Sequence, residues 1–149
     1  MMNLSELPLR RIFTIVAAMN FIAGFGSMLL PRLHLQLFYS LAPETVDAIL
    51  LLYHQMFWTV VVIMGGAYFI MAQNPRGHQG ILFVGALGKL GAALAWVYAL
   101  AKGLANPIVL GGIAWDGSWG IFFIILLWQY YREGSSTIMF LSEKMKSSI

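Results

Sequence analysis

Residues 85–96 read GALGKLGAALAW, a run of small and apolar residues around one lysine, Lys89. Stretches of this kind suit tight helix packing in lipid, because small residues let two helix backbones approach closely. A charge in such a stretch needs partners, since an isolated charge in hydrocarbon is costly. The stretch therefore poses two questions, whether it crosses a membrane and which groups meet Lys89.

The composition is that of an integral membrane protein. Of the 149 residues, 60% are hydrophobic and only 10% are charged, whereas soluble domains carry about 25% charged residues. So few charges do not cover the surface of a soluble globular domain, which excludes that class. The chain has no cysteine, which excludes thiolate metal sites, and its basic residues do not cluster, which excludes a nucleic-acid partner.

Four apolar stretches are each long enough to cross the bilayer as a helix. A helix needs about 20 apolar residues to span about 30 Å of hydrocarbon, and it satisfies its own backbone hydrogen bonds there. Short connectors make neighbouring helices antiparallel. We therefore predict a single membrane domain over residues 1–149, an all-α up-down-up-down bundle of four transmembrane helices. The predicted spans are residues 12–30, 49–72, 81–101 and 109–131.

The connector of residues 31–48 is longer than the others and differs in kind. Leu33, Leu37 and Leu41 recur there at helical spacing, which predicts a short amphipathic helix at the membrane interface. Pro43 resembles a helix start, because proline suits the first turn of a helix. We therefore expect the second transmembrane helix to begin before the hydrocarbon.

The basic residues predict the orientation. Cytoplasmic segments of inner-membrane proteins carry an excess of Lys and Arg. If the N-terminus is inside, only Arg32 and Lys102 fall in outer loops. We therefore expect a multi-pass protein of the inner membrane, with both termini and the polar tail of residues 132–149 in the cytoplasm. The basic residues expected on the cytoplasmic side are Arg10, Arg11, Arg76, Arg132, Lys144 and Lys146.

Three ionisable residues lie inside the predicted spans, and such residues are functional-site hypotheses by default. They are His54, Lys89 and Asp116, accompanied by the amides Asn20 and Gln55. Small residues flank Asn20, Lys89 and Asp116 at helical spacing, so these side chains are expected to face the bundle interior. The bulky side chains expected to face lipid instead include Ile121, Phe122, Ile125 and Leu126.

Depth along the helices separates these polar residues. With a rise of about 1.5 Å per residue, His54 and Asp116 share one level, and Lys89 shares a deeper level with Asn20. A direct Lys89–Asp116 bridge would require the ammonium to lie about 9 Å from the level of Lys89 along the bundle axis. We therefore expect a chain of polar contacts instead. One interpretation is a hydrated pocket where Asp116 and His54 exchange a proton or hold a ligand above Lys89. The other is that these groups only satisfy one another and set the helix register.

Aromatic side chains gather in the same half of the bundle as His54 and Asp116. Interfacial belts of aromatic residues are common in membrane proteins, and Trp128 with Tyr130 and Tyr131 fits such a belt. Other aromatic residues lie at the depth of the polar group and are candidates to line its pocket. These are Tyr53, Trp58, Trp96, Trp115 and Trp119.

Metal and cofactor sites have weak support in the sequence. His54 is the one histidine inside a predicted span, whereas haem b needs axial ligation by histidine with a second ligand. His34 and His78 are expected to be solvated loop residues. No cluster of histidines and carboxylates supplies three metal ligands. We expect no metal and no resident cofactor, and leave quinone and haem b as alternatives.

Several short motifs follow one another along the chain, namely Gly24-Phe25-Gly26, Leu30-Pro31, Tyr53-His54-Gln55, Asn74-Pro75-Arg76, Gly88-Lys89 and Asp116-Gly117. In this order they resemble the small uncharacterised four-helix membrane proteins of the DoxX-like kind. Some members of the wider DoxX group are associated with quinone-linked sulfur oxidation, so the resemblance implies that chemistry as a possibility. It carries over no catalytic residue.

Two functions remain open from the sequence. The first is a non-catalytic protein that binds a small ligand or lipid, or serves as an accessory subunit beside another membrane protein or a second copy of itself. The second is a quinone-linked redox or proton-coupled enzyme component that uses the pocket near His54 and Asp116.

Overall fold

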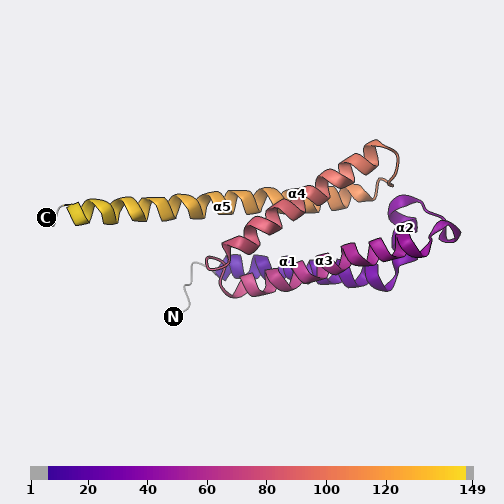
Figure 1. Cartoon of the computed structure of the whole chain (residues 1–149), viewed down its shortest axis with the longest axis horizontal. Coiled ribbons are helices and arrows are strands. Elements are labelled where there is room, and N and C mark those ends of the chain that lie inside the picture. The colour runs from indigo at the N-terminus through magenta and orange to yellow at the C-terminus, as the bar shows by residue number, and fades with distance from the viewer. Residues whose placement is uncertain (1–6, 147–149) are drawn as a thin grey trace.

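The computed structural model describes residues 7–146, where the regular secondary structure consists of helices joined by short turns (Figure 1). Four helices are long and apolar enough to cross a membrane, which confirms the predicted all-α four-helix membrane bundle. They are α1 (Leu7–Leu29), α3 (Ala48–Gln73), α4 (Gln79–Ala101) and α5 (Val109–Lys146). The protein is thus a multi-pass membrane protein.

The surface of the bundle is apolar along all four long helices. Ile22, Leu52, Leu94 and Ile121, one on each helix, are all more than half exposed. A continuous surface of this kind would aggregate in water, whereas lipid is as apolar as these side chains. The exposed side chains therefore meet the bilayer.

The last helix is longer than its predicted span. The apolar part of α5 is Val109–Glu133, and the helix continues without a break to Lys146. Figure 1 shows this extension projecting beyond the other helices. The segment expected to be a polar tail is therefore helical up to Lys146, and residues 1–6 and 147–149 lie outside the described part of the chain.

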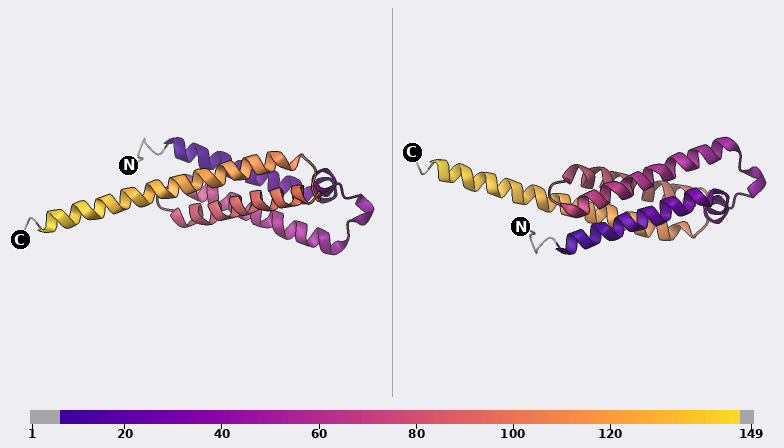
Figure 2. Two further views of the ribbon diagram at one scale, coloured as in Figure 1. Left: turned by 90° about the horizontal axis from the view of Figure 1, so that it is seen from above. Right: turned by 90° about the horizontal axis from the view of Figure 1, so that it is seen from below.

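The four long helices form two pairs, α1 with α3 and α4 with α5 (Figures 1 and 2). Glycines allow the close approach inside each pair. A Cβ atom at Gly24 of α1 would lie 2.5 Å from Cγ2 of Val62 on α3, and one at Gly120 of α5 would lie 2.7 Å from the Leu90 side chain on α4. Contacts between the pairs are sparser than contacts within them, and they consist mainly of a few positions where α3 touches α4.

The two pairs meet in a core at one end of the bundle, here named the Asn74 end because the turn between α3 and α4 lies there. Phe13, Met71, Leu82 and Phe123 come from the four long helices and are wholly buried in this core. Leu126 is buried with them, contrary to the expectation that it faces lipid. The reason is that Leu126 lies three residues after Phe123, on the same face of α5.

The opposite end of the bundle, here named the α2 end, is covered by the short helix α2 (Pro31–Tyr39). The sequence predicted this helix. Pro43 begins a short 3-10 helix (Pro43–Thr45) rather than α3. Helix α3 starts at Ala48, where Oδ1 of Asp47 accepts a hydrogen bond of 2.7 Å from the Leu50 N–H.

Asn106, in the connector between α4 and α5, ties α2 to the second pair. Its backbone N–H donates to the carbonyl of Phe38, and its side-chain amide donates to the carbonyl of Leu37, both at 2.8 Å. The hydroxyl of Ser40 donates to the Asn106 amide oxygen at 2.6 Å. Because α2 is also continuous with the first pair, it bridges both pairs at the α2 end.

Candidate functional site

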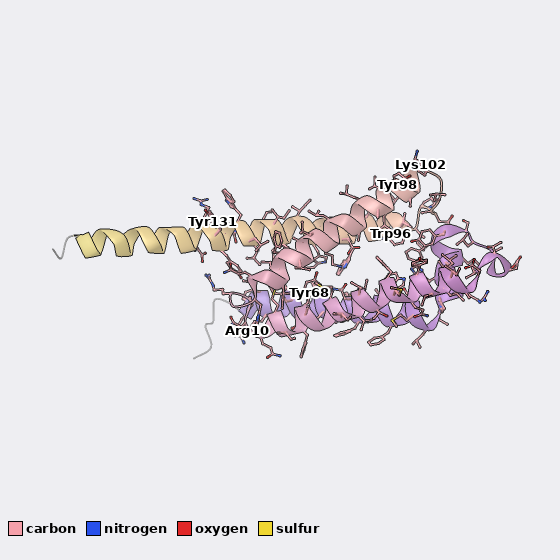
Figure 3. All side chains as sticks on the ribbon, viewed as in Figure 1. Arg10, Tyr68, Trp96, Tyr98, Lys102 and Tyr131 are labelled. Carbon is pink, nitrogen blue, oxygen red and sulfur yellow. The ribbon has the colours of Figure 1, made fainter. Side chains whose placement is uncertain are left out.

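The pairs are joined by the core at the Asn74 end and by α2 at the other end, and a cavity of about 420 Å³ lies between them. All four long helices and α2 contribute to its wall. Figure 3 labels two of its lining residues, Tyr68 and Trp96, on the facing sides of the two pairs. Of the site residues expected from the sequence, the cavity is lined by Asn20, Trp58, Lys89, Trp96, Trp115 and Asp116.

Lys89 forms the polar floor of this cavity with two partners from other helices. Its ammonium donates to Oδ1 of Asp116 at 2.6 Å and to Oδ1 of Asn20 at 3.3 Å. Asn20 is held in turn, since its Nδ2 donates to the Val16 carbonyl at 3.1 Å. The three side chains link α1, α4 and α5 and thereby connect the two helix pairs.

The direct ion pair between Lys89 and Asp116 differs from the expectation of a longer polar chain. That expectation measured depth along straight, parallel helices. Figure 1 shows α4 crossing α5 obliquely, so equal distances along the two helices do not correspond to equal depths. The inclination, together with the flexible lysine stem, brings the ammonium to the carboxylate.

His54 belongs to a different cluster from Asp116. Its Nε2 lies 3.1 Å from Nδ1 of His34 on α2, and both rings are buried. The expectation that His34 is a solvated loop residue is therefore wrong. His34 stacks on Phe38 with ring centroids 4.2 Å apart and meets the edge of Trp58 at 4.9 Å. Its spacing of four residues from Phe38 placed the two on one face of the predicted helix, which is the signal that sequence reasoning overlooked.

Three other residues expected at the site lie outside the cavity lining. The side-chain amide of Gln55 donates to the carbonyl of Met28 at 3.0 Å and so joins α3 to α1. Tyr53 is 66% exposed on the outer surface of α3. Trp119 packs against Trp115, with ring centroids 5.5 Å apart. Gln55 and Trp119 therefore make contacts around the cavity without lining it, and Tyr53 faces away from it.

Aromatic side chains close the cavity at the α2 end. Trp96 stacks on Tyr39 with ring centroids 5.5 Å apart. The ring centroids of Trp96 and Phe38 are 5.6 Å apart. Phe38 lines the cavity itself. Sequence reasoning missed Phe38, Tyr39 and Tyr68 because an apolar or aromatic residue carries no signal of which neighbour it will meet. Helix α2 therefore acts as a cap whose aromatic face covers the cavity.

The surroundings of the two histidines favour neutral rings. Burial, and to a smaller extent the neighbouring His54, lowers the pKa of His34 from 6.5 to about 4. Within residues 7–146, the outer ring nitrogens, Nε2 of His34 and Nδ1 of His54, are buried and make no hydrogen bond. A proton added to either ring would lack an acceptor there, so the neutral pair is the stable state.

This environment predicts that the protein loses stability in mild acid. Unfolding returns His34 to its ordinary pKa of 6.5, whereas the folded value is about 4. Between these pH values the unfolded state binds more protons, so the free energy of unfolding falls as the pH falls from 6.5 towards 4. Above pH 6.5 the contribution of His34 is complete.

The measurement is the unfolding of detergent-solubilised protein between pH 4 and pH 7, which is about the range set by the two pKa values. His34→Gln should show a flatter dependence on pH than the wild type. His78→Gln, which changes a histidine in the turn before α4, should keep the wild-type dependence. Equal slopes in the wild type and His34→Gln would contradict the assignment.

Across the described residues, no group of three or more histidine and carboxylate side chains is placed to hold a metal ion. The haem hypothesis depended on His54, and that ring contacts His34 and does not line the cavity. The residues that line the cavity thus offer an ion pair, an amide and aromatic rings.

The chain was compared with protein families, curated proteins and solved structures. No family model, curated protein or solved structure matches it.

Proposed function

We propose that this membrane protein binds a small amphiphile or lipid in the cavity between its two helix pairs. The observation that carries the proposal is the division of the cavity wall into two parts. Lys89, Asp116 and Asn20 form a polar floor, and the surrounding side chains are mostly apolar or aromatic. A volume of about 420 Å³ falls within the range of about 300–1,000 Å³ typical of small-molecule sites.

Openings to the lipid support the same proposal. Phe57 and Val60 on α3 and Val84 on α4 line the cavity, and they are also 49%, 58% and 56% exposed. A side chain that lines a cavity and is half exposed lies at the rim of an opening. Because α3 and α4 make few contacts, a ligand dissolved in the bilayer can reach the floor by passing between these helices.

A larger side chain beside this opening should weaken binding. Gly88 lines the cavity, and a Cβ atom there would meet no atom within 4 Å, so the first carbon of the Gly88→Leu side chain is accommodated and the rest occupies space at the cavity. We expect the occupancy of co-purified amphiphile, measured by native mass spectrometry, to fall about tenfold, the effect of about 1.4 kcal/mol.

Gly91→Leu is the matched control for this variant. Gly91 lies on the same helix with equally open space around its Cβ position, but it does not line the cavity. The two variants change helix propensity equally. Gly91→Leu should keep the wild-type occupancy, and equal occupancy in both variants would count against the cavity as the binding site.

We further propose that the protein resides in the inner membrane with the Asn74 end in the cytoplasm and the α2 end outside. The excess of Lys and Arg near the Asn74 end supports this orientation. The native chain has no cysteine, so a single introduced cysteine is the only thiol that a maleimide can label, and its labelling reports the orientation. In intact spheroplasts, an impermeant maleimide should label Lys102→Cys and should label Gln79→Cys only after the membrane is opened; the reverse result would invert the orientation.

A second candidate function is a quinone-linked redox or proton-coupled component of the DoxX-like kind. The meeting of an ammonium and a carboxylate beside Trp96 and Trp115 favours it, because a quinone presents carbonyl acceptors and a flat ring. An organic extract of the purified protein distinguishes the candidates. If the ultraviolet spectrum of the extract has a quinone band that changes on reduction, the second candidate is supported. If the extract contains an amphiphile but shows no quinone band, the first candidate is supported.

A further inference from the structure

The floor of the cavity carries opposite charges that compensate each other. Lys89 is paired with Asp116 at 2.6 Å, and Asn20 adds a neutral acceptor at 3.3 Å. A ligand at the floor therefore meets no net charge. An anionic head group would have to lie beside the Asp116 carboxylate or separate it from Lys89, and repulsion between like charges is strong where water is excluded.

The same floor has unused hydrogen-bonding capacity of both kinds. An ammonium has three N–H donors, of which Lys89 uses one for Asp116 and one for Asn20. Within residues 7–146, Oδ2 of Asp116 accepts no hydrogen bond. The Asp116 side chain is 17% exposed, so its carboxylate is accessible from the cavity that it lines. One donor and one acceptor thus remain side by side.

A hydroxyl group fits this pattern, because it donates one hydrogen bond and accepts others. Resting on the binding function proposed above, we propose that the cavity selects an uncharged amphiphile with a hydroxyl head group over an anionic one of the same chain length. The hydroxyl oxygen accepts from Lys89, and its proton is donated to Oδ2 of Asp116. The ion pair stays intact throughout.

The shape of the cavity fits a head group with part of a chain. Its volume of about 420 Å³ lies near the lower end of the range of about 300–1,000 Å³ typical of small-molecule sites. A longer chain extends through the opening flanked by Phe57, Val60 and Val84 and stays in the bilayer. The ligand thus enters sideways, head first, from the membrane.

The test compares hexadecanol with hexadecanoate, each brominated at the same chain position, added to the protein in nanodiscs at high pH so that the acid is ionised. Bromine quenches tryptophan fluorescence on contact, and the cavity lining includes Trp58, Trp96 and Trp115. Trp128 faces the lipid and is quenched by probe dissolved in the bilayer. This background is measured with Gly88→Leu, and its quenching is subtracted from that of the wild type. The expected half-saturation concentration is about tenfold lower for the alcohol than for the acid, or about 1.4 kcal/mol.

A charge-changing variant sharpens the test. Asp116→Asn leaves the Lys89 ammonium without its carboxylate, so the preference should shift towards the acid. Equal binding of the two probes, or tighter binding of the acid, by the wild type overturns the selectivity and leaves amphiphile binding intact. Identical quenching of the wild type and Gly88→Leu by both probes overturns the binding function itself. Tighter binding of the alcohol, with a shift towards the acid in Asp116→Asn, supports the proposal.

Discussion

Lys89→Met is expected to lower the free energy of unfolding by about 3 kcal/mol, the usual cost of breaking a buried ion pair by removing one partner. The methionine fills most of the volume of the lysine stem. It leaves the partly buried Asp116 beside the cavity without the ammonium that lies 2.6 Å away in the wild type. It also removes the contact with Asn20, so α1, α4 and α5 lose the polar link that joins the two pairs.

The measurement is unfolding in mixed micelles with a rising fraction of a denaturing detergent, followed by circular dichroism. The double variant Lys89→Met with Asp116→Leu should recover most of the loss, because replacing both members of a buried pair by apolar residues is often neutral. Leu87→Met, a change on the exposed face of the same helix, should be neutral as well. If Lys89→Met is as stable as Leu87→Met, the ion pair does not stabilise the bundle.

Gly120→Ala is expected to lower the free energy of unfolding by about 2 kcal/mol, the range of an overpacked helix contact. The added Cβ atom would lie 2.7 Å from both Cγ and Cδ2 of Leu90 and 3.2 Å from the Leu90 backbone nitrogen. The backbone nitrogen is fixed by α4, and Cγ moves only if the leucine changes its χ1 rotamer, so either Leu90 must repack or α4 and α5 must separate. The cavity depends on this pair, because Lys89 precedes Leu90 and Asp116 lies four residues before Gly120.

Gly111→Ala provides the matched comparison on the same helix. A Cβ atom at Gly111 would meet no atom within 4 Å, so the change should stabilise the helix by up to about 1 kcal/mol through helix propensity. The two alanine variants should therefore change the free energy of unfolding in opposite directions in the mixed-micelle titration. A Gly120→Ala protein at least as stable as Gly111→Ala would mean that α4 and α5 approach less closely than described.

The candidate site could be predicted only in part. Asn20, Lys89 and Asp116 were identified because a polar residue inside an apolar span has few ways to be satisfied, and small neighbours indicated the interior face. The partner of His54 was missed, because His34 lies in the connector after the first predicted span, where a histidine is expected to be solvated. The direct Lys89–Asp116 contact was missed because a helix inclination is set by packing against neighbours, which depth along one helix does not contain.

The sequence by itself determined that this is a four-helix membrane protein and which segments form the spans, because the length of an apolar run and the need to satisfy the backbone in lipid are local constraints. Only the tertiary structure decided that the helices join as two pairs, that α2 caps the space between them, and that Lys89 meets Asp116 at the floor of a cavity. These features depend on close contacts between distant segments, such as Gly24 with Val62 and Gly120 with Leu90. In lipid, apolar faces gain little by choosing one apolar neighbour over another, so shape and polar contacts select the partners.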